Sequence, residues 1–240
     1  MKQNSNFNKI KAFTLAEVLL VVAIIGITAA LALPNLTQNV DEDKYVMMAK
    51  TTYNELDSGV SRMLANKSIS EIYEDAGATT PATMSKAVVD ELSKYIKMGM
   101  NCGNSITQCY NSSKIYKEYD GAAISNKTWQ ASKTEAAAFT LPSGAVVVVY
   151  GSTNKPLLDF DVDGEKGPCK CNVDIFRSVI DSDSLTADLY SLYAGDPNGH
   201  KKGNANLDMA YDGLEWVLSV GNMDYLHCNN LNWSTKHQCD

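Results

Sequence analysis

The sequence predicts an α+β protein in which one long N-terminal helix packs on a small antiparallel sheet, with a loop-rich C-terminal region. Two patterns carry this prediction. Apolar and then helix-periodic residues extend from about Phe13 to about Leu64, and short β-prone runs separated by turn residues begin at Ala137. With 240 residues, the chain has room for one domain and an appendage.

The N-terminal segment has the length of a single membrane span. Val18 to Leu33 gives sixteen positions without a charge, and extended back to Phe13 the run contains one charged residue, Glu17. A membrane helix needs roughly 20 apolar residues. Lysines precede the run and acids follow it (Lys2, Lys9 and Lys11; Asp41, Glu42 and Asp43). The positive-inside rule therefore places the N-terminus in the cytoplasm and the remaining chain outside.

Three interpretations of this segment differ in how well they account for Glu17. A secretory signal peptide would be cleaved after Ala30-Leu31-Ala32, and an ordinary signal anchor would stay uncleaved. Both tolerate Glu17 poorly, because a lone carboxylate in an apolar helix costs roughly a few kcal/mol to insert. The third interpretation gives the glutamate a role.

The stretch KAFTLAEVLL, which begins at Lys11, resembles the cleavage and methylation motif of type IV prepilins and type II secretion pseudopilins. That family has a short basic leader, a small residue that is usually Gly, then Phe-Thr-Leu-x-Glu and an apolar helix. The resemblance implies that a prepilin peptidase cuts between Ala12 and Phe13 and methylates the new amine of Phe13. Ala12 departs from the usual Gly.

The resemblance also implies that Glu17 is the assembly glutamate. A buried carboxylate is tolerated where it meets a cation, and the Phe13 amine of a neighbouring subunit is such a cation, since methylation keeps its charge. The alternative is that Glu17 snorkels to the lipid headgroups from near the helix end.

Gly26 and Pro34 fall where the family often has helix-loosening residues. Pro34 either ends the span or forms a hinge between a membrane half, residues 13–35, and an amphipathic half, residues 36–65. A stripe with helical spacing beyond Pro34 favours the hinge. It comprises Val46, Ala49, Tyr53, Leu56, Val60 and Met63. The helix would then measure roughly 80 Å.

Residues 1–12 are thus the expected leader and residues 66–240 the exported globular head. Met84 to Met98 has the spacing of a short amphipathic helix, and residues 99–130 have the composition of loops. Residues 137–141 and 145–150, joined by Pro-Ser-Gly, predict a hairpin, and residues 156–162 a third strand. This meander is expected to lie on the amphipathic half of the long helix.

An acidic run in the head is a candidate calcium site. Asp159, Asp161, Asp163 and Glu165 alternate with other residues, and Gly164 follows the third Asp, as at the start of an EF-hand loop. The twelfth position of that loop is Lys170 instead of Glu, so the segment is not an EF-hand. The alternative is a polar strand end whose acids are solvated.

The six cysteines all lie beyond Met100, which suits disulfides in an exported head. Cys102 and Cys109 are close enough in sequence to pair with each other. Cys228 and Cys239 are near neighbours too, and the other four cysteines could instead pair across two segments, Cys169 and Cys171 with Cys228 and Cys239. A zinc site made by Cys169, Cys171, Cys228 and either His227 or His237 is the alternative, although its spacing matches no common zinc finger.

Catalytic motifs are absent from the sequence: it has no G-x-S-x-G, H-E-x-x-H or P-loop. The net charge of −7 becomes −10 without the three leader lysines, which argues against nucleic-acid binding. We therefore expect a non-enzymatic pilin-like subunit of a pilus or type II secretion pseudopilus, serving secretion, DNA uptake or adhesion. Its expected partners are other pilin or pseudopilin subunits, prepilin peptidase, the inner-membrane assembly platform and membrane lipid. The alternative is a membrane-anchored exported binding protein or enzyme that shares only the anchor.

Overall fold

The computed structural model describes residues 14–110, 135–153, 155–167, 169–181, 184–186, 213–227, 231 and 235–239, without the side chains of residues 29–40 and 165. The chain divides into two compact units, Met1–Asp41 and Glu42–Asp240. Helices and an antiparallel sheet confirm the predicted α+β class.

Helix α1 spans Leu15–Leu64, close to the predicted limits, and its helical assignment continues through Gly26 and Pro34. The described residues contain no helix with the length and hydropathy of a membrane span. The predicted span over residues 13–35 and the hinge stay predictions.

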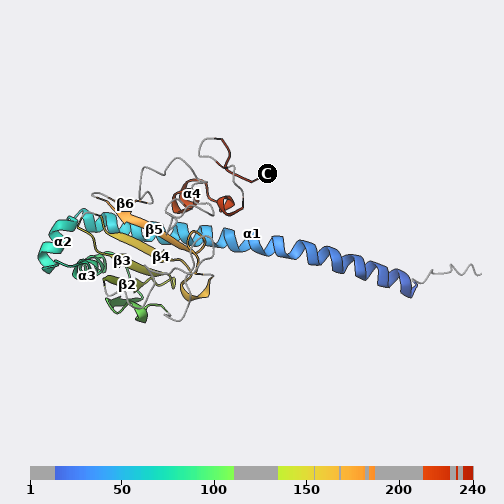
Figure 1. Ribbon diagram of the computed structural model, residues 1–240, viewed down its shortest axis with the longest axis horizontal. Coiled ribbons are helices and arrows are strands. Elements are labelled where there is room, and N and C mark those ends of the chain that lie inside the picture. Colours follow the sequence, from blue (N-terminus) through green and yellow to red (C-terminus); the bar gives the residue numbers. More distant parts are fainter. Residues whose placement is uncertain are drawn as a thin grey trace, which may run out of the picture. The chain divides into compact units, whose positions relative to one another are not determined.

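The part of α1 that belongs to the second unit packs as its periodicity predicts. The stripe residues Val46, Ala49, Leu56, Val60 and Met63 are buried, and Tyr53 is partly buried. They share one core with strand residues, which confirms that this half of the helix covers the sheet (Figure 1).

Two short helices follow. Helix α2 spans Ile69–Ala76 and was not predicted; a capping box between Ser68 and Glu71 begins it, and Gly77 with φ of 59° ends it. Helix α3 spans Pro81–Leu92, earlier than the predicted 84–98, because Thr80 caps it and Pro81 occupies its first turn.

Within the described residues, the sheet has six antiparallel strands in chain order. They are β1 Met100–Gly103, β2 Ala136–Thr140, β3 Val146–Tyr150, β4 Leu157–Asp161, β5 Ile175–Ile180 and β6 Leu185–Thr186. The predicted hairpin is β2–β3, and the predicted third strand is β4. Sequence analysis missed β1, which lies in a segment predicted as loop, and also β5 and β6.

Both faces of the sheet are buried. On one face, Ala137, Phe139, Val147 and their neighbours join the core that α1 and α3 cover. On the other face, Ala138, Val148 and their neighbours join a second cluster that contains the Cys102–Cys109 disulfide. Successive strand residues point to opposite faces, and β2, β3 and β5 accordingly contribute to both clusters.

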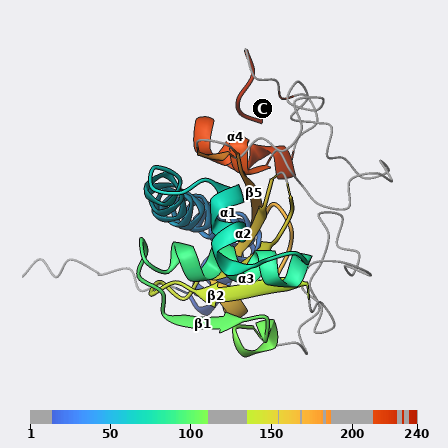
Figure 2. The ribbon, with the colours of Figure 1, turned by 90° about the vertical axis from the view of Figure 1, so that its left-hand side faces the viewer.

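The remaining described elements are short. The 3₁₀ turns are η1 Ile106–Gln108, η2 Gly164–Lys166 and η3 Asp224–Leu226, and helix α4 spans Gly213–Ser219. Helix α3 packs on β2 and β3, and α4 packs on β5 (Figures 1 and 2).

Candidate functional site

The start of α1 holds Glu17 in a capping box. The Glu17 Oε2 atom accepts hydrogen bonds from the backbone N–H and the hydroxyl of Thr14, each at 2.8 Å, and the Thr14 Oγ1 atom accepts from the Glu17 N–H at 3.2 Å. This reciprocal arrangement satisfies free N–H groups at a helix start. Sequence analysis missed it, although the Thr-x-x-Glu spacing is its usual signal.

The apolar side chains of α1 that follow Glu17 are exposed in the single chain. Between Leu15 and Ile27, nine large hydrophobic residues expose about half of their surface or more. No heavy atom lies within 4 Å of a Cβ placed on Gly26. The predicted cleavage residues, Ala12 and Phe13, and the side chain of Pro34 lie outside the described part of the chain.

In the head, the structure divides the acids of the predicted calcium site. Asp161 and Asp163 come together with Asp174, and one ligand oxygen from each lies within 4.8 Å of the others. All three residues are buried. Asp159 is not part of this group, and the side chain of Glu165 is outside the description.

Asp174 was missed because it lies on the far side of a loop, directly before β5. Its Oδ2 accepts from the Cys169 N–H at 2.7 Å, and its Oδ1 accepts from the Lys170 N–H at 2.6 Å. Asp163 Oδ1 accepts from the Gly167 N–H at 3.0 Å. These backbone bonds hold two of the carboxylates in place.

Electrostatics in this group disfavour ionised carboxylates. Burial, together with the charges of Asp174 and Asp163, raises the pKa of Asp161 to about 9. Burial also raises the pKa of Asp174 to about 6, against the lowering effect of its bonds from Lys170 and Cys169.

Asp159 instead forms a buried ion pair with Arg177. The two residues face each other across β4 and β5, and their side chains are 1% and 7% exposed. Both Asp159 oxygens accept hydrogen bonds, one from Arg177 Nε and one from Arg177 Nη2 at 2.6 Å. This paired geometry makes Asp159 a structural residue and corrects its assignment to the calcium site.

The cysteines bear out one predicted pair. Cys102 and Cys109 form a disulfide. Cys239 is disulfide-bonded, whereas Cys169 and Cys171 are thiols buried in the second cluster. The predicted pairing of Cys169 and Cys171 with Cys228 and Cys239 is therefore wrong for these two thiols. Cys228 lies outside the described residues.

The predicted zinc alternative also lacks support among the described residues. The metal-ligand group found there contains only carboxylates. His227 Nε2 lies 2.8 Å from Glu42 Oε1, and the ring of His237 packs edge-on against Trp216 with centroids 5.9 Å apart.

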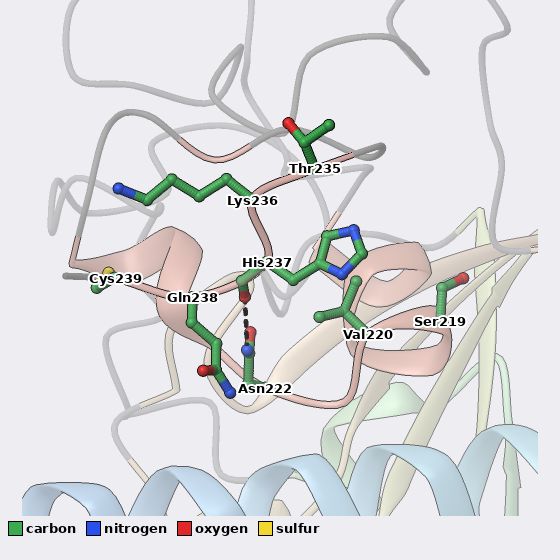
Figure 3. Close-up of a pocket in the computed structure, with 8 residues that line it drawn as sticks. All are labelled: Ser219, Val220, Asn222, Thr235, Lys236, His237, Gln238 and Cys239. Atoms are coloured by element: carbon green, nitrogen blue, oxygen red, sulfur yellow. Dashed lines mark hydrogen bonds between the residues drawn. The ribbon is translucent and has the colours of Figure 1, made fainter.

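A pocket lies beside the end of α4 (Figure 3). It is lined by Ser219, Val220, Asn222, Thr235, Lys236, His237, Gln238 and Cys239. Within it, the Asn222 side-chain amide donates to the His237 carbonyl at 2.8 Å, and the Asn222 Oδ1 atom accepts from Trp216 Nε1 at 2.8 Å.

Comparison with known protein families matches residues 7–33 to the prokaryotic N-terminal methylation motif. This motif is the signature of type IV pilins and pseudopilins, and it confirms the resemblance carried by KAFTLAEVLL. No curated protein and no solved structure matches the chain. The motif indicates a pilin-like substrate of prepilin peptidase and covers only the N-terminal part of the chain.

Proposed function

We propose that the chain is a structural subunit of a pilus or a type II secretion pseudopilus. Prepilin peptidase cuts it between Ala12 and Phe13 and methylates the Phe13 amine. The apolar half of α1 then anchors the subunit in the inner membrane, with the head exported, until the subunit enters a filament. The matched methylation motif is the observation that carries this proposal.

The exposed apolar surface of α1 supports a filament role. Large side chains such as Leu19 and Ile27, at 61% and 63% exposure, have no cover in the single chain. A helix that is apolar all round is stable only inside lipid or protein. Lipid supplies that cover before assembly and neighbouring subunits supply it afterwards.

Glu17 would then change partners on assembly. In the single chain, Thr14 satisfies its carboxylate. In the filament, the methylated Phe13 amine of a neighbouring subunit takes over as a cationic partner, because a carboxylate removed from water needs a positive charge to compensate it. Thr14→Val removes the hydroxyl and keeps the carboxylate, so this variant should still assemble.

The N-terminal mass of the mature chain tests the proposal. The full chain is expressed with and without prepilin peptidase, and its N-terminal peptide is analysed by mass spectrometry. With the peptidase, we expect a chain that begins at N-methylated Phe13. Ala12→Leu, which places a bulky residue at the cut, should leave the precursor intact.

Three results would contradict the proposal. A mature chain that begins at Leu33 would show cleavage by signal peptidase after Ala30-Leu31-Ala32. A chain that stays uncut in the presence of active peptidase would show that the N-terminal segment is an ordinary signal anchor. Processing without incorporation into any filament would favour the anchored binding protein or enzyme.

A further inference from the structure

Three buried carboxylates meet where β4 ends and β5 begins. Asp161 is the last residue of β4, Asp163 directly precedes η2, and Asp174 directly precedes β5. Their exposed fractions are 0%, 6% and 0%, and one oxygen from each lies within 4.8 Å of the others. Within the described residues, none of the three forms an ion pair, so three carboxyl groups face one another without a cation.

The side chain of Asp161 supplies a second, independent observation. Both of its carboxylate oxygens are buried and have no partner at hydrogen-bonding geometry. The nearby backbone N–H groups of Asp163 and Gly164 only partly offset the effect of burial on its pKa. A buried polar group without a partner is costly, and an ionised carboxylate more so. Because Asp161 reaches into the group that Asp163 and Asp174 complete, a ligand at that point would satisfy both oxygens.

We propose that Asp161, Asp163 and Asp174 bind one calcium ion. Carboxylate oxygens are the ligands of hard cations, and calcium accepts six to eight oxygens in variable geometry. Zinc fits less well, since it prefers nitrogen and sulfur ligands in a closed tetrahedron. Magnesium fits less well too, because it demands near-ideal octahedral geometry and gives up water reluctantly.

The loop between the strands is shaped around this group. A Cβ placed on Gly167 would lie 2.3 Å from Asp174 Oδ2 and 2.7 Å from Asp163 Oδ1, so a side chain there would displace both carboxylates. The N–H groups of Gly167, Cys169 and Lys170 bond the same two carboxylates. Bound calcium would tie the end of β4 to the start of β5 and fix the loop. Calcium binding by these residues of the head does not depend on N-terminal processing.

Calcium titration of the full chain tests the proposal. The chain is purified in detergent, stripped with EGTA and dialysed, and CaCl₂ is added in a calorimeter. We expect one ion per chain. At calcium one hundred times the dissociation constant, the melting temperature should rise by about 5–10 °C. MgCl₂ at the same concentration should produce a smaller rise.

Substitutions identify the ligands. Asp163→Asn and Asp174→Asn should each abolish or greatly weaken calcium binding and the melting shift. Asp181→Asn is the matched control, because Asp181 is a partly exposed carboxylate paired with Lys155 outside the group, and its binding should be unchanged. Gly167→Ala should weaken calcium binding although it removes no ligand.

Asp161→Asn should affect stability differently in EGTA and in calcium. In EGTA it replaces a buried carboxyl group, which has like groups beside it and no cation, with a neutral amide, so the melting temperature should stay the same or rise. Addition of calcium should not raise the melting temperature of this variant. If this variant does not fold, calorimetry on Asp163→Asn, at the edge of the group, decides the matter. Absence of calcium binding to the unsubstituted chain would overturn the proposal. Undiminished binding by Asp163→Asn or Asp174→Asn, or equal binding of magnesium, would do so as well.

Discussion

Replacing Arg177 with Met should destabilise the head more than any exposed charge substitution. Arg177→Met keeps the length of the side chain but removes both hydrogen bonds to Asp159. The carboxylate of Asp159 is 1% exposed, so water cannot replace the lost partner. An uncompensated charge would remain buried between β4 and β5.

The geometry sets the size of the effect. Removing one partner of a buried ion pair costs roughly 3–5 kcal/mol, mostly because the other charge is left without compensation. For a domain of this size, that corresponds to a decrease of roughly 6–20 °C in melting temperature. Removing both charges, with Asp159→Leu added to Arg177→Met, should recover most of the loss, since apolar groups of similar volume can replace a buried pair.

Thermal and urea unfolding of the full chain in detergent, in the presence of EGTA, measure the loss. Lys155→Met is the matched control. It breaks the Lys155–Asp181 pair, whose 2.7 Å contact joins side chains that are 57% and 40% exposed. Such surface pairs contribute about 0–1 kcal/mol. A loss for Arg177→Met no larger than that for Lys155→Met would refute the reasoning, as would a double variant no more stable than Arg177→Met.

Three further predictions concern assembly, the disulfide and the core. Glu17→Val should still be cleaved and methylated but enter sheared filaments poorly; normal incorporation would remove its proposed role. Replacing both Cys102 and Cys109 by Ser should lower the free energy of unfolding by roughly 2–3 kcal/mol, because the disulfide no longer closes the short loop between them. Reductant should cause no further loss of stability at this site in the double variant. Leu56→Ala should cost roughly 2–5 kcal/mol in urea unfolding. Met47→Ala, at a position 70% exposed, should change stability by less than about 0.5 kcal/mol.

Local patterns in the sequence determine the long helix, the central strands and the N-terminal motif. The 3–4 spacing from Val46 to Met63 predicts the buried face of α1 because helical periodicity is a property of neighbouring residues. The Pro-Ser-Gly turn and its β-prone flanks predict β2 and β3 for the same reason. The motif around Glu17 depends on contiguous residues, and the comparison with known families confirms it.

Tertiary structure decides the chemistry of the head. Asp159, Asp161 and Asp163 alternate in sequence as three similar acids, but cross-strand pairing gives Asp159 to Arg177 and leaves the other two with Asp174. That division depends on strand register and on a loop that returns the chain to the same sheet edge. The second face of the sheet is also buried, a condition that the alternation of polar and apolar residues in β4 does not predict. A carboxylate removed from water needs a cation or a hydrogen-bond donor as its partner. Burial in the folded head therefore makes these acids part of an ion pair and of a candidate calcium site, although the sequence alone allows them to be solvated.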